Sequence, residues 1–234
     1  MIEEPGRNLG AEFDLDILAN LLNERTRLVC VGGASNLTGT INDVKAISRL
    51  CRDAGAWSYI DAVQLAPHVA IDVQELGCDF LVCSAYKFFG PHQGILYGRR
   101  EILESLTPYK VRPAPEALPW AFETGTQSHE GMAGTAAAVD YYAWVGENLA
   151  GAYHDRNRAY PGRRGHIRSA LQYMFDYERE LAEHLVDDLA ASSFTTGDVT
   201  GNVVGVLESS AARVNELTRG IGELNYRIAS LKSE

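Results

Sequence analysis

One lysine stands out by its neighbours in the sequence. Lys87 lies between Tyr86 and a Phe-Phe pair, after the apolar run 79–83 and before a Gly-Pro breaker. An amine among apolar side chains loses hydration, so its free base is favoured and can attack an aldehyde. The structural alternative is a lysine whose stem covers a sheet edge while its ammonium group stays in water. The segment alone leaves both interpretations open.

Polar side chains follow three apolar runs of strand length. Asp61 and Gln64 come after one run, and Ser84 follows another, just before Lys87. Asn36 lies in a polar turn after a third run. Because ligands of open α/β sheets gather beyond the carboxyl ends of the strands, we expect these side chains to lie near one another. Their grouping favours the functional interpretation of Lys87.

The elements that must position these residues alternate between strands and helices. Asp14 and Asp43 are expected to cap two helices, and Gly55 to end the second. This alternation predicts an α/β fold with a mostly parallel sheet and flanking helices, followed by C-terminal helices. Expected strands are 26–31, 57–60, 79–83 and 95–97, and expected helices are 73–76, 99–106, from 131 onward, 167–191 and 211–231.

The composition restricts the class of protein. Hydrophobic residues make up 46% and charged residues 22%, which is typical of a globular chain. A formal charge of −10 argues against nucleic acid or an anionic membrane as the main partner. The N-terminal residues lack an apolar signal core, and no run approaches membrane-spanning length. We therefore expect a cytoplasmic protein.

Four cysteines show neither a C-x-x-C pair nor a cysteine–histidine spacing suited to a metal. They fall in or beside apolar runs, so we expect reduced core residues and no metal site. Their positions also argue against a persulfide carrier, which needs a mobile loop. The four are Cys30, Cys51, Cys78 and Cys83.

The candidate residues match the needs of a pyridoxal phosphate site. Such a site requires a lysine for the aldehyde, a carboxylate for the pyridinium nitrogen, a donor for the phenolic oxygen and groups that bind phosphate. Asp61 fits the carboxylate, and Gln64 or Asn36 fits the donor. Ser84 fits the phosphate hydroxyl.

Three motifs occur in order along the chain: SN-x-x-GT at 35–40, DAVQ-x-x-PH at 61–68 and CDFLVCSAYKFFGP at 78–91. Together they resemble the class V aminotransferase family, and within it the cysteine desulfurase-like branch, over about residues 13 to 150. The resemblance implies the fold-type I architecture and pyridoxal 5'-phosphate as cofactor. It also implies that Lys87 forms the Schiff base, Asp61 pairs with the ring nitrogen, and Gln64 and Asn36 lie near the phenolic oxygen.

The resemblance implies two contacts to the cofactor phosphate. Ser84 contacts the phosphate, and Thr126 reaches the phosphate of a neighbouring subunit, so a homodimer is implied. Tyr86 stands where many members have histidine, which puts one phosphate contact in doubt. His68 and His92 are expected to be structural hydrogen-bonding groups, with general acid–base catalysis as the other interpretation.

Family members carry an N-terminal segment with the phosphate loop and a ring that stacks on the cofactor, and neither has a counterpart here. Their small C-terminal domain, with the substrate arginine, also has no clear match. We therefore expect a truncated member with weak cofactor binding and negligible turnover. The expected parts are a partial cofactor-binding large domain at 1–150, a linker or loop at 151–165, and a helical remnant of the small domain at 166–234.

The resulting hypothesis is a pyridoxal-phosphate-dependent enzyme, or a fragment of one, that acts on an amino acid in the manner of a cysteine desulfurase. One alternative is a catalytically inactive homologue that serves as an interaction module. Another is an aminotransferase or epimerase of the same fold.

Overall fold

The computed structural model describes residues 13–123 and 125–191. The expected helix at 211–231 lies outside the described residues. The chain divides into two compact units, with the boundary between Phe175 and Asp176. The strands of the described residues and the candidate site residues belong to the first unit. Within the described ranges, no helix is long and apolar enough to cross a membrane.

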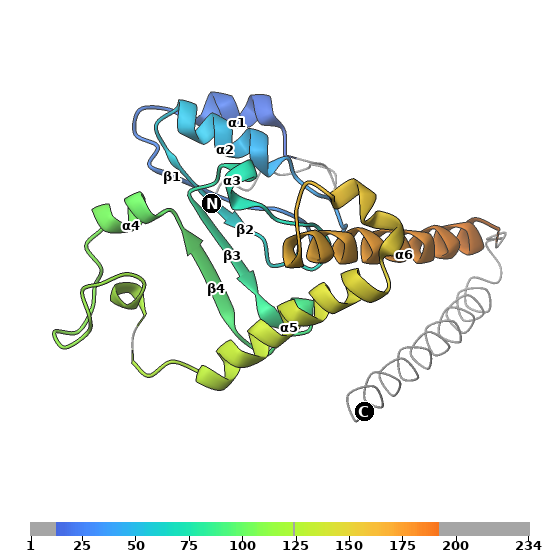
Figure 1. The fold of residues 1–234 in the computed structure, drawn as a ribbon. Coiled ribbons are helices and arrows are strands. Elements are labelled where there is room, and N and C mark those ends of the chain that lie inside the picture. The colour runs from blue at the N-terminus through green and yellow to red at the C-terminus, as the bar shows by residue number, and fades with distance from the viewer. Residues whose placement is uncertain (1–12, 124, 192–234) are drawn as a thin grey trace, which may run out of the picture. The chain divides into compact units, whose positions relative to one another are not determined.

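The first unit is built on a four-stranded sheet in the order β1-β2-β3-β4 (Figure 1). The first three strands are parallel, and β4 pairs antiparallel with β3. The prediction of an α/β fold with a mostly parallel sheet and flanking helices is confirmed. The strands are β1 Leu28–Gly32, β2 Trp57–Asp61, β3 Phe80–Ser84 and β4 Gly94–Gly98.

Two helices begin at the expected caps. Asp14 accepts hydrogen bonds from the backbone N–H groups of Asp16 and Ile17, both at 3.0 Å, at the start of α1. Asp43 accepts one from Ala46 at 2.9 Å at the start of α2. Local capping chemistry is thus sufficient to place both helix starts. These helices are α1 Leu15–Leu21 and α2 Val44–Asp53, and the other α-helices are α3 Val73–Leu76, α4 Arg100–Ser105, α5 His129–Asn148 and α6 Arg163–Ala191.

The stretch expected as a linker or loop, 151–165, contains two 3₁₀ turns and the first residues of α6. Asn157 explains why it is ordered, since this buried side chain donates hydrogen bonds to Ser169 Oγ at 3.2 Å and Gln172 Oε1 at 2.9 Å. Those contacts are distant in sequence, so local composition could not reveal them. The four 3₁₀ turns in the described ranges are η1 Ala85–Phe88, η2 Trp120–Phe122, η3 Gly151–Tyr153 and η4 Asp155–Asn157.

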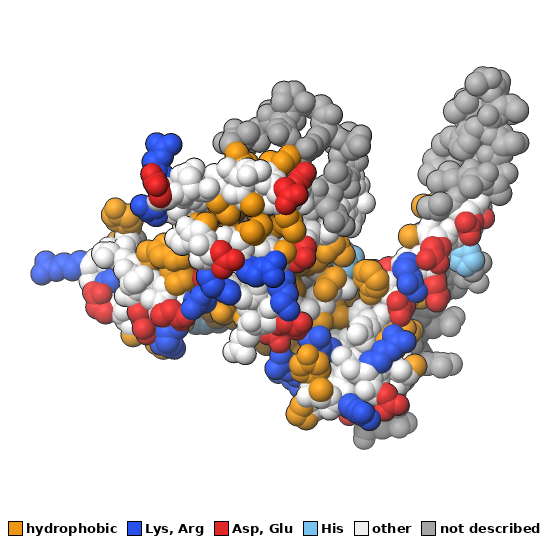
Figure 2. Space-filling model, turned by 90° about the horizontal axis from the view of Figure 1, so that it is seen from above, with side chains coloured by type: hydrophobic (Ala, Val, Ile, Leu, Met, Phe, Trp, Pro, Cys, Tyr) orange, Lys and Arg blue, Asp and Glu red, His pale blue; other side chains and the backbone are white. Residues whose placement is uncertain are grey.

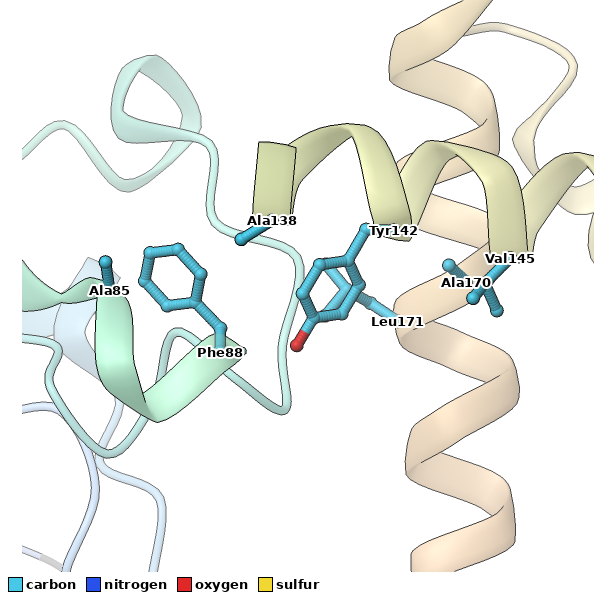
Figure 3. Close-up of a cluster of buried hydrophobic side chains, with 7 residues drawn as sticks. All are labelled: Ala85, Phe88, Ala138, Tyr142, Val145, Ala170 and Leu171. Carbon is cyan, nitrogen blue, oxygen red and sulfur yellow. The ribbon is translucent and has the colours of Figure 1, made fainter. Parts of the chain in front are cut away.

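Two buried clusters hold the first unit together. One lies between α2, the sheet and the segment around Leu65. The other joins η1 to α5 and α6, and in Figure 3 the rings of Phe88 and Tyr142 and the side chain of Leu171 lie close together. The turn that carries Lys87 therefore packs against a buried apolar cluster. The second cluster consists of Ala85, Phe88, Ala138, Tyr142, Val145, Ala170 and Leu171.

One face of the sheet is largely exposed among the described residues. Leu28, Trp57 and Leu96 share this face, and they are 47%, 37% and 56% exposed. Cys30 lies on the same face, so its expected place in the core is wrong. Strand alternation explains the difference, because every second side chain of β1 points away from α2.

Helix α1 also leaves apolar side chains exposed. It has no buried residue, Leu21 is half-exposed, and Phe13 just before the helix is half-exposed as well. The view from above in Figure 2 shows apolar side chains between acidic and basic groups. Exposed apolar surface is thus found on a helix as well as on the sheet.

Candidate active site

Asp61 and Ser84 lie on the same face at the carboxyl edge of the sheet. Asp61 ends β2 and pairs with Val82, and Ser84 follows Val82 by two residues on β3. Side chains two residues apart on a strand share a face, and neighbouring strands are about 4.8 Å apart. The two polar groups are therefore close enough to contact one small molecule.

Asp61 has one carboxylate oxygen that is already used. Its Oδ1 accepts the backbone N–H of Val63 at 2.9 Å, and its carbonyl accepts the N–H of Gly33 at 2.7 Å. The described residues offer no hydrogen-bond partner to Oδ2, and the side chain is exposed. An oriented carboxylate with a free oxygen can pair with a protonated ring nitrogen or another cation.

Gln64 lies one turn beyond Asp61. The chain makes a helical turn here, in which the N–H of Ala66 bonds to the carbonyl of Ala62 at 2.8 Å. Gln64 Nε2 lies 3.4 Å from His68 Nε2, so the imidazole and the amide orient each other. This contact supports the structural interpretation of His68.

Lys87 is exposed, contrary to the apolar surroundings expected from its neighbours. The 3₁₀ turn η1 explains this, because residues three apart lie on one side of such a turn. Ala85 and Phe88 therefore face the buried cluster together, whereas Lys87 and Tyr86 face outward. The lysine Nζ lies 5.4 Å from the centre of the Tyr86 ring.

The end of this turn depends on a glycine. The N–H of Gly90 donates to the carbonyl of Ala85 at 2.9 Å, and Phe89 has a positive φ of 66°. A Cβ at Gly90 would lie 2.8 Å from the Cβ of Ala85, so a larger residue would force the turn open. The position of Lys87 relative to β3 is thus fixed by backbone contacts.

Ser84 precedes η1 but makes no side-chain cap to it. Within the described ranges its hydroxyl has no hydrogen-bond partner, and the side chain is partly exposed. A free hydroxyl beside a lysine is suited to donating to an anionic oxygen.

Asn36 and Thr126 are less closely tied to this group. Asn36 is exposed in a turn that Ser35 stabilises by accepting the N–H groups of Leu37 and Thr38, both at 3.2 Å. Thr126 is exposed in the segment before α5. The register of β2 and β3 thus places Asp61 and Ser84 on one face, with the turn that carries Lys87 directly after Ser84, whereas no hydrogen bond among the described residues joins Asn36 or Thr126 to them.

Tyr86 and His92 form an aromatic pair that the sequence did not predict. Tyr86 stacks on His92 with ring centres 5.1 Å apart and planes 17° from parallel. The only sign in the sequence was that two ring-bearing residues flank the FFGP turn. The ring of Tyr86 thus contacts both the imidazole of His92 and the ammonium group of Lys87.

The edge of the sheet thus carries an amine, an oriented carboxylate, an amide and a free hydroxyl. In the part of the chain that the structure covers, no group of histidine, cysteine or acidic side chains is arranged to hold a metal ion. The set is suited to holding a small molecule with a carbonyl, a basic nitrogen and an anionic group.

Two cysteine desulfurases are similar in sequence. The enzyme of Pectobacterium atrosepticum is 39% identical over 153 residues, which cover 59% of this chain and 38% of the enzyme. The probable cysteine desulfurase of Halalkalibacterium halodurans is 39% identical over 137 residues, covering 53% of this chain and 34% of that protein. The chain therefore spans well under half the length of these relatives.

Solved structures of cysteine desulfurases are also similar to this chain, again over less than half of their own length. The cysteine desulfurase CsdA from Escherichia coli matches with a TM-score of 0.58 and 29% identity, over 76% of this chain and 41% of that one. The apo cysteine desulfurase from Thermococcus onnurineus matches with a TM-score of 0.61 and 25% identity, over 78% and 42%. Residues 6–164 match the family described as Aminotransferase class-V. Since this match covers most of the chain, the protein belongs to the class V aminotransferase family.

Proposed function

We propose that the chain forms part of a pyridoxal-phosphate-dependent enzyme that acts on an amino acid in the manner of a cysteine desulfurase, with Lys87 as the covalent attachment point. The observation that carries the proposal is the shared edge of β2 and β3. There the exposed carboxylate of Asp61 and the free hydroxyl of Ser84 share a face, just ahead of the turn that bears Lys87.

The residues present fit this cofactor. Asp61 would pair with the ring nitrogen through Oδ2, which accepts no hydrogen bond from a described residue. Gln64 and Asn36 would meet the phenolic oxygen, and Ser84 would donate to the phosphate. Thr126 would reach the phosphate bound by the other subunit of a homodimer.

Bound pyridoxal phosphate supplies a ring that withdraws electrons from the Cα of an attached amino acid. The chain's own residues do the rest. Lys87 would hold the aldehyde group, and its Nζ, once free, would accept the α-proton of the substrate. Its exposure and flexible stem would allow this movement. Asp61 would keep the ring nitrogen protonated.

Absorbance spectroscopy tests the proposal. We expect added pyridoxal phosphate to give a visible band that borohydride removes, and Lys87→Ala to lack this band. Lys45→Ala, an exposed lysine on α2, is the matched control and should keep it. Identical spectra for wild type and Lys87→Ala would refute the assignment of Lys87.

A second candidate is a non-catalytic role in which the chain binds another polypeptide. The exposed apolar side chains of Leu28, Trp57 and Leu96 favour it, because contiguous apolar patches often mark protein contacts. The two candidates differ in the Lys87→Ala experiment, since only the first requires the band.

A further inference from the structure

A cavity of about 640 Å³ lies behind β3, away from the candidate active site. Leu81 and Cys83 line it, and they alternate along the strand with Val82 and Ser84, which face the other side. Its volume falls in the usual range for small-molecule pockets, about 300–1,000 Å³. The cavity is therefore separate from the edge that carries Asp61 and Ser84.

The walls of the cavity are apolar. They come from β3, η1, α5, α6 and the segment 66–71. Three of the lining side chains, Phe88, Tyr142 and Leu171, belong to the buried cluster drawn in Figure 3. Such walls are suited to a hydrocarbon or aromatic body.

Three arginines from the start of α6 also line the cavity: Arg163, Arg164 and Arg168. A guanidinium group has a planar set of donors that matches a carboxylate, and its stem packs against apolar surface. The cavity thus has apolar walls and one side that is lined by cationic groups.

Only two of these arginines have a carboxylate partner among the described residues. Arg163 pairs with Asp140 at 2.7 Å, and Arg164 pairs with Asp72. Arg168 instead lies over the ring of Tyr160, 4.2 Å from its centre.

The Nε of Arg168 is buried and has no hydrogen-bond partner in the described part of the chain. Asp72 interacts electrostatically with both Arg164 and Arg168, so these three guanidinium groups share the two carboxylates of Asp72 and Asp140, which leaves one net positive charge beside the cavity. A buried donor without a partner is costly, and a shift of the Arg168 side chain toward the cavity would let a ligand oxygen accept from this Nε.

We propose that this cavity binds a small carboxylic acid with an apolar body, and that its carboxylate pairs with Arg168. A monoanion matches the single uncompensated charge. The hydrocarbon part replaces water along the walls formed by β3, α5 and α6. Phe88 lines the cavity next to Lys87 in η1, so an occupant would also pack against the turn that carries the lysine.

Equilibrium dialysis of the full chain, without pyridoxal phosphate, tests the proposal. The probes are laurate, dodecanol and dodecyltrimethylammonium, which share a long hydrocarbon chain and differ in the charge of the head group. We expect one laurate per chain, with dodecanol about tenfold weaker and the cation weaker still, because a charge-assisted hydrogen bond contributes more than a neutral one. Equal binding of the three would overturn the proposal, and so would no binding of laurate.

Variants then locate the site. Arg168→Met should weaken laurate binding about tenfold and leave dodecanol within about twofold. Arg158→Met, an exposed arginine that does not line the cavity, is the matched control and should change neither. Ala70→Phe should fill the cavity and abolish binding of all three probes. Unchanged laurate binding in a folded Arg168→Met or Ala70→Phe, checked by circular dichroism, would refute the site.

Discussion

Two aspartates, one at the end of β2 and one just before β3, have opposite surroundings. Asp61 is exposed, and one of its oxygens lacks a partner among the described residues. Asp79 is buried, its Oδ2 accepts hydrogen bonds from Ser58, and its Oδ1 accepts one from Arg99. The first is free to bind a ligand, whereas the second is committed to the fold. Residue type alone does not distinguish a ligand-binding aspartate from a structural one. The position of Asp61 at the end of a predicted strand made that distinction.

Asp61→Asn should reduce cofactor-dependent activity far more than stability. The amide oxygen of asparagine can still accept the N–H of Val63, so the free energy of unfolding should fall by less than about 1 kcal/mol. Loss of the negative charge opposite the ring nitrogen should lower the residual cofactor-dependent activity, slow as it is in this chain, about a hundredfold. Urea unfolding and single-turnover sulfide release from cysteine at saturating pyridoxal phosphate, measured on the same preparations, check this. A parallel loss of both would mean that Asp61 serves the fold.

The cysteines should react in a fixed order. Burial raises the pKa of the Cys51, Cys78 and Cys83 thiols, so less reactive thiolate is present at neutral pH. Cys30 is exposed. We expect iodoacetamide at pH 7.5 to label Cys30 first, and the other three to gain reactivity only as the pH rises toward their raised pKa values. Mass spectrometry of a labelling time course checks the order. Fast labelling that persists in Cys30→Ser would contradict it.

At the scale of elements, Asp79 ties three strands together. Its side chain bonds to the backbone N–H of Ser58 at 2.9 Å and to Arg99 Nη1 at 3.1 Å, which links β3 to β2 and to the residue that follows β4. Arg99 also pairs with Glu101. These strands position the candidate site, so the network supports it from the opposite end of the sheet.

Asp79→Ala should lower the free energy of unfolding by about 3 kcal/mol, because it leaves buried donors of Ser58 without an acceptor and removes one of the two carboxylates that pair with Arg99. Glu104→Ala removes an exposed pair with Arg100 and should cost about 0.5 kcal/mol or less. Urea unfolding of both variants measures the difference. Equal losses would show that the network adds nothing beyond an exposed ion pair.

The elements also show what the sequence could predict. The caps at Asp14 and Asp43 and the apolar runs of the strands are local signals, so two helix starts and the positions of the strands along the chain followed from them. The outward direction of Lys87 depends on a 3₁₀ turn seated against α5 and α6, which are distant in sequence. The expected roles of all six candidate site residues stay predictions: Asn36, Asp61, Gln64, Ser84, Lys87 and Thr126.

At the scale of the whole molecule, one face of the sheet carries exposed apolar side chains, in addition to those on helices and loops. Leu28 lies on β1 and Leu96 on β4, the two edge strands of the described sheet. Lysine on an edge strand opposes pairing with another chain, and its charge breaks an apolar patch. Neither position is buried, so neither substitution should disturb the core. This face should therefore control how the chain associates.

The double variant Leu28→Lys, Leu96→Lys should bind less of the dye anilinonaphthalene sulfonate and scatter less light at high concentration. Its free energy of unfolding should change by less than about 1 kcal/mol, because both side chains are half-exposed. Val111→Lys is the control, since Val111 is exposed in a loop away from the sheet. Dye fluorescence and static light scattering of the three proteins give the comparison. If the control lowers both signals as much as the double variant does, the apolar surface that binds the dye lies elsewhere, and the sheet face does not control association.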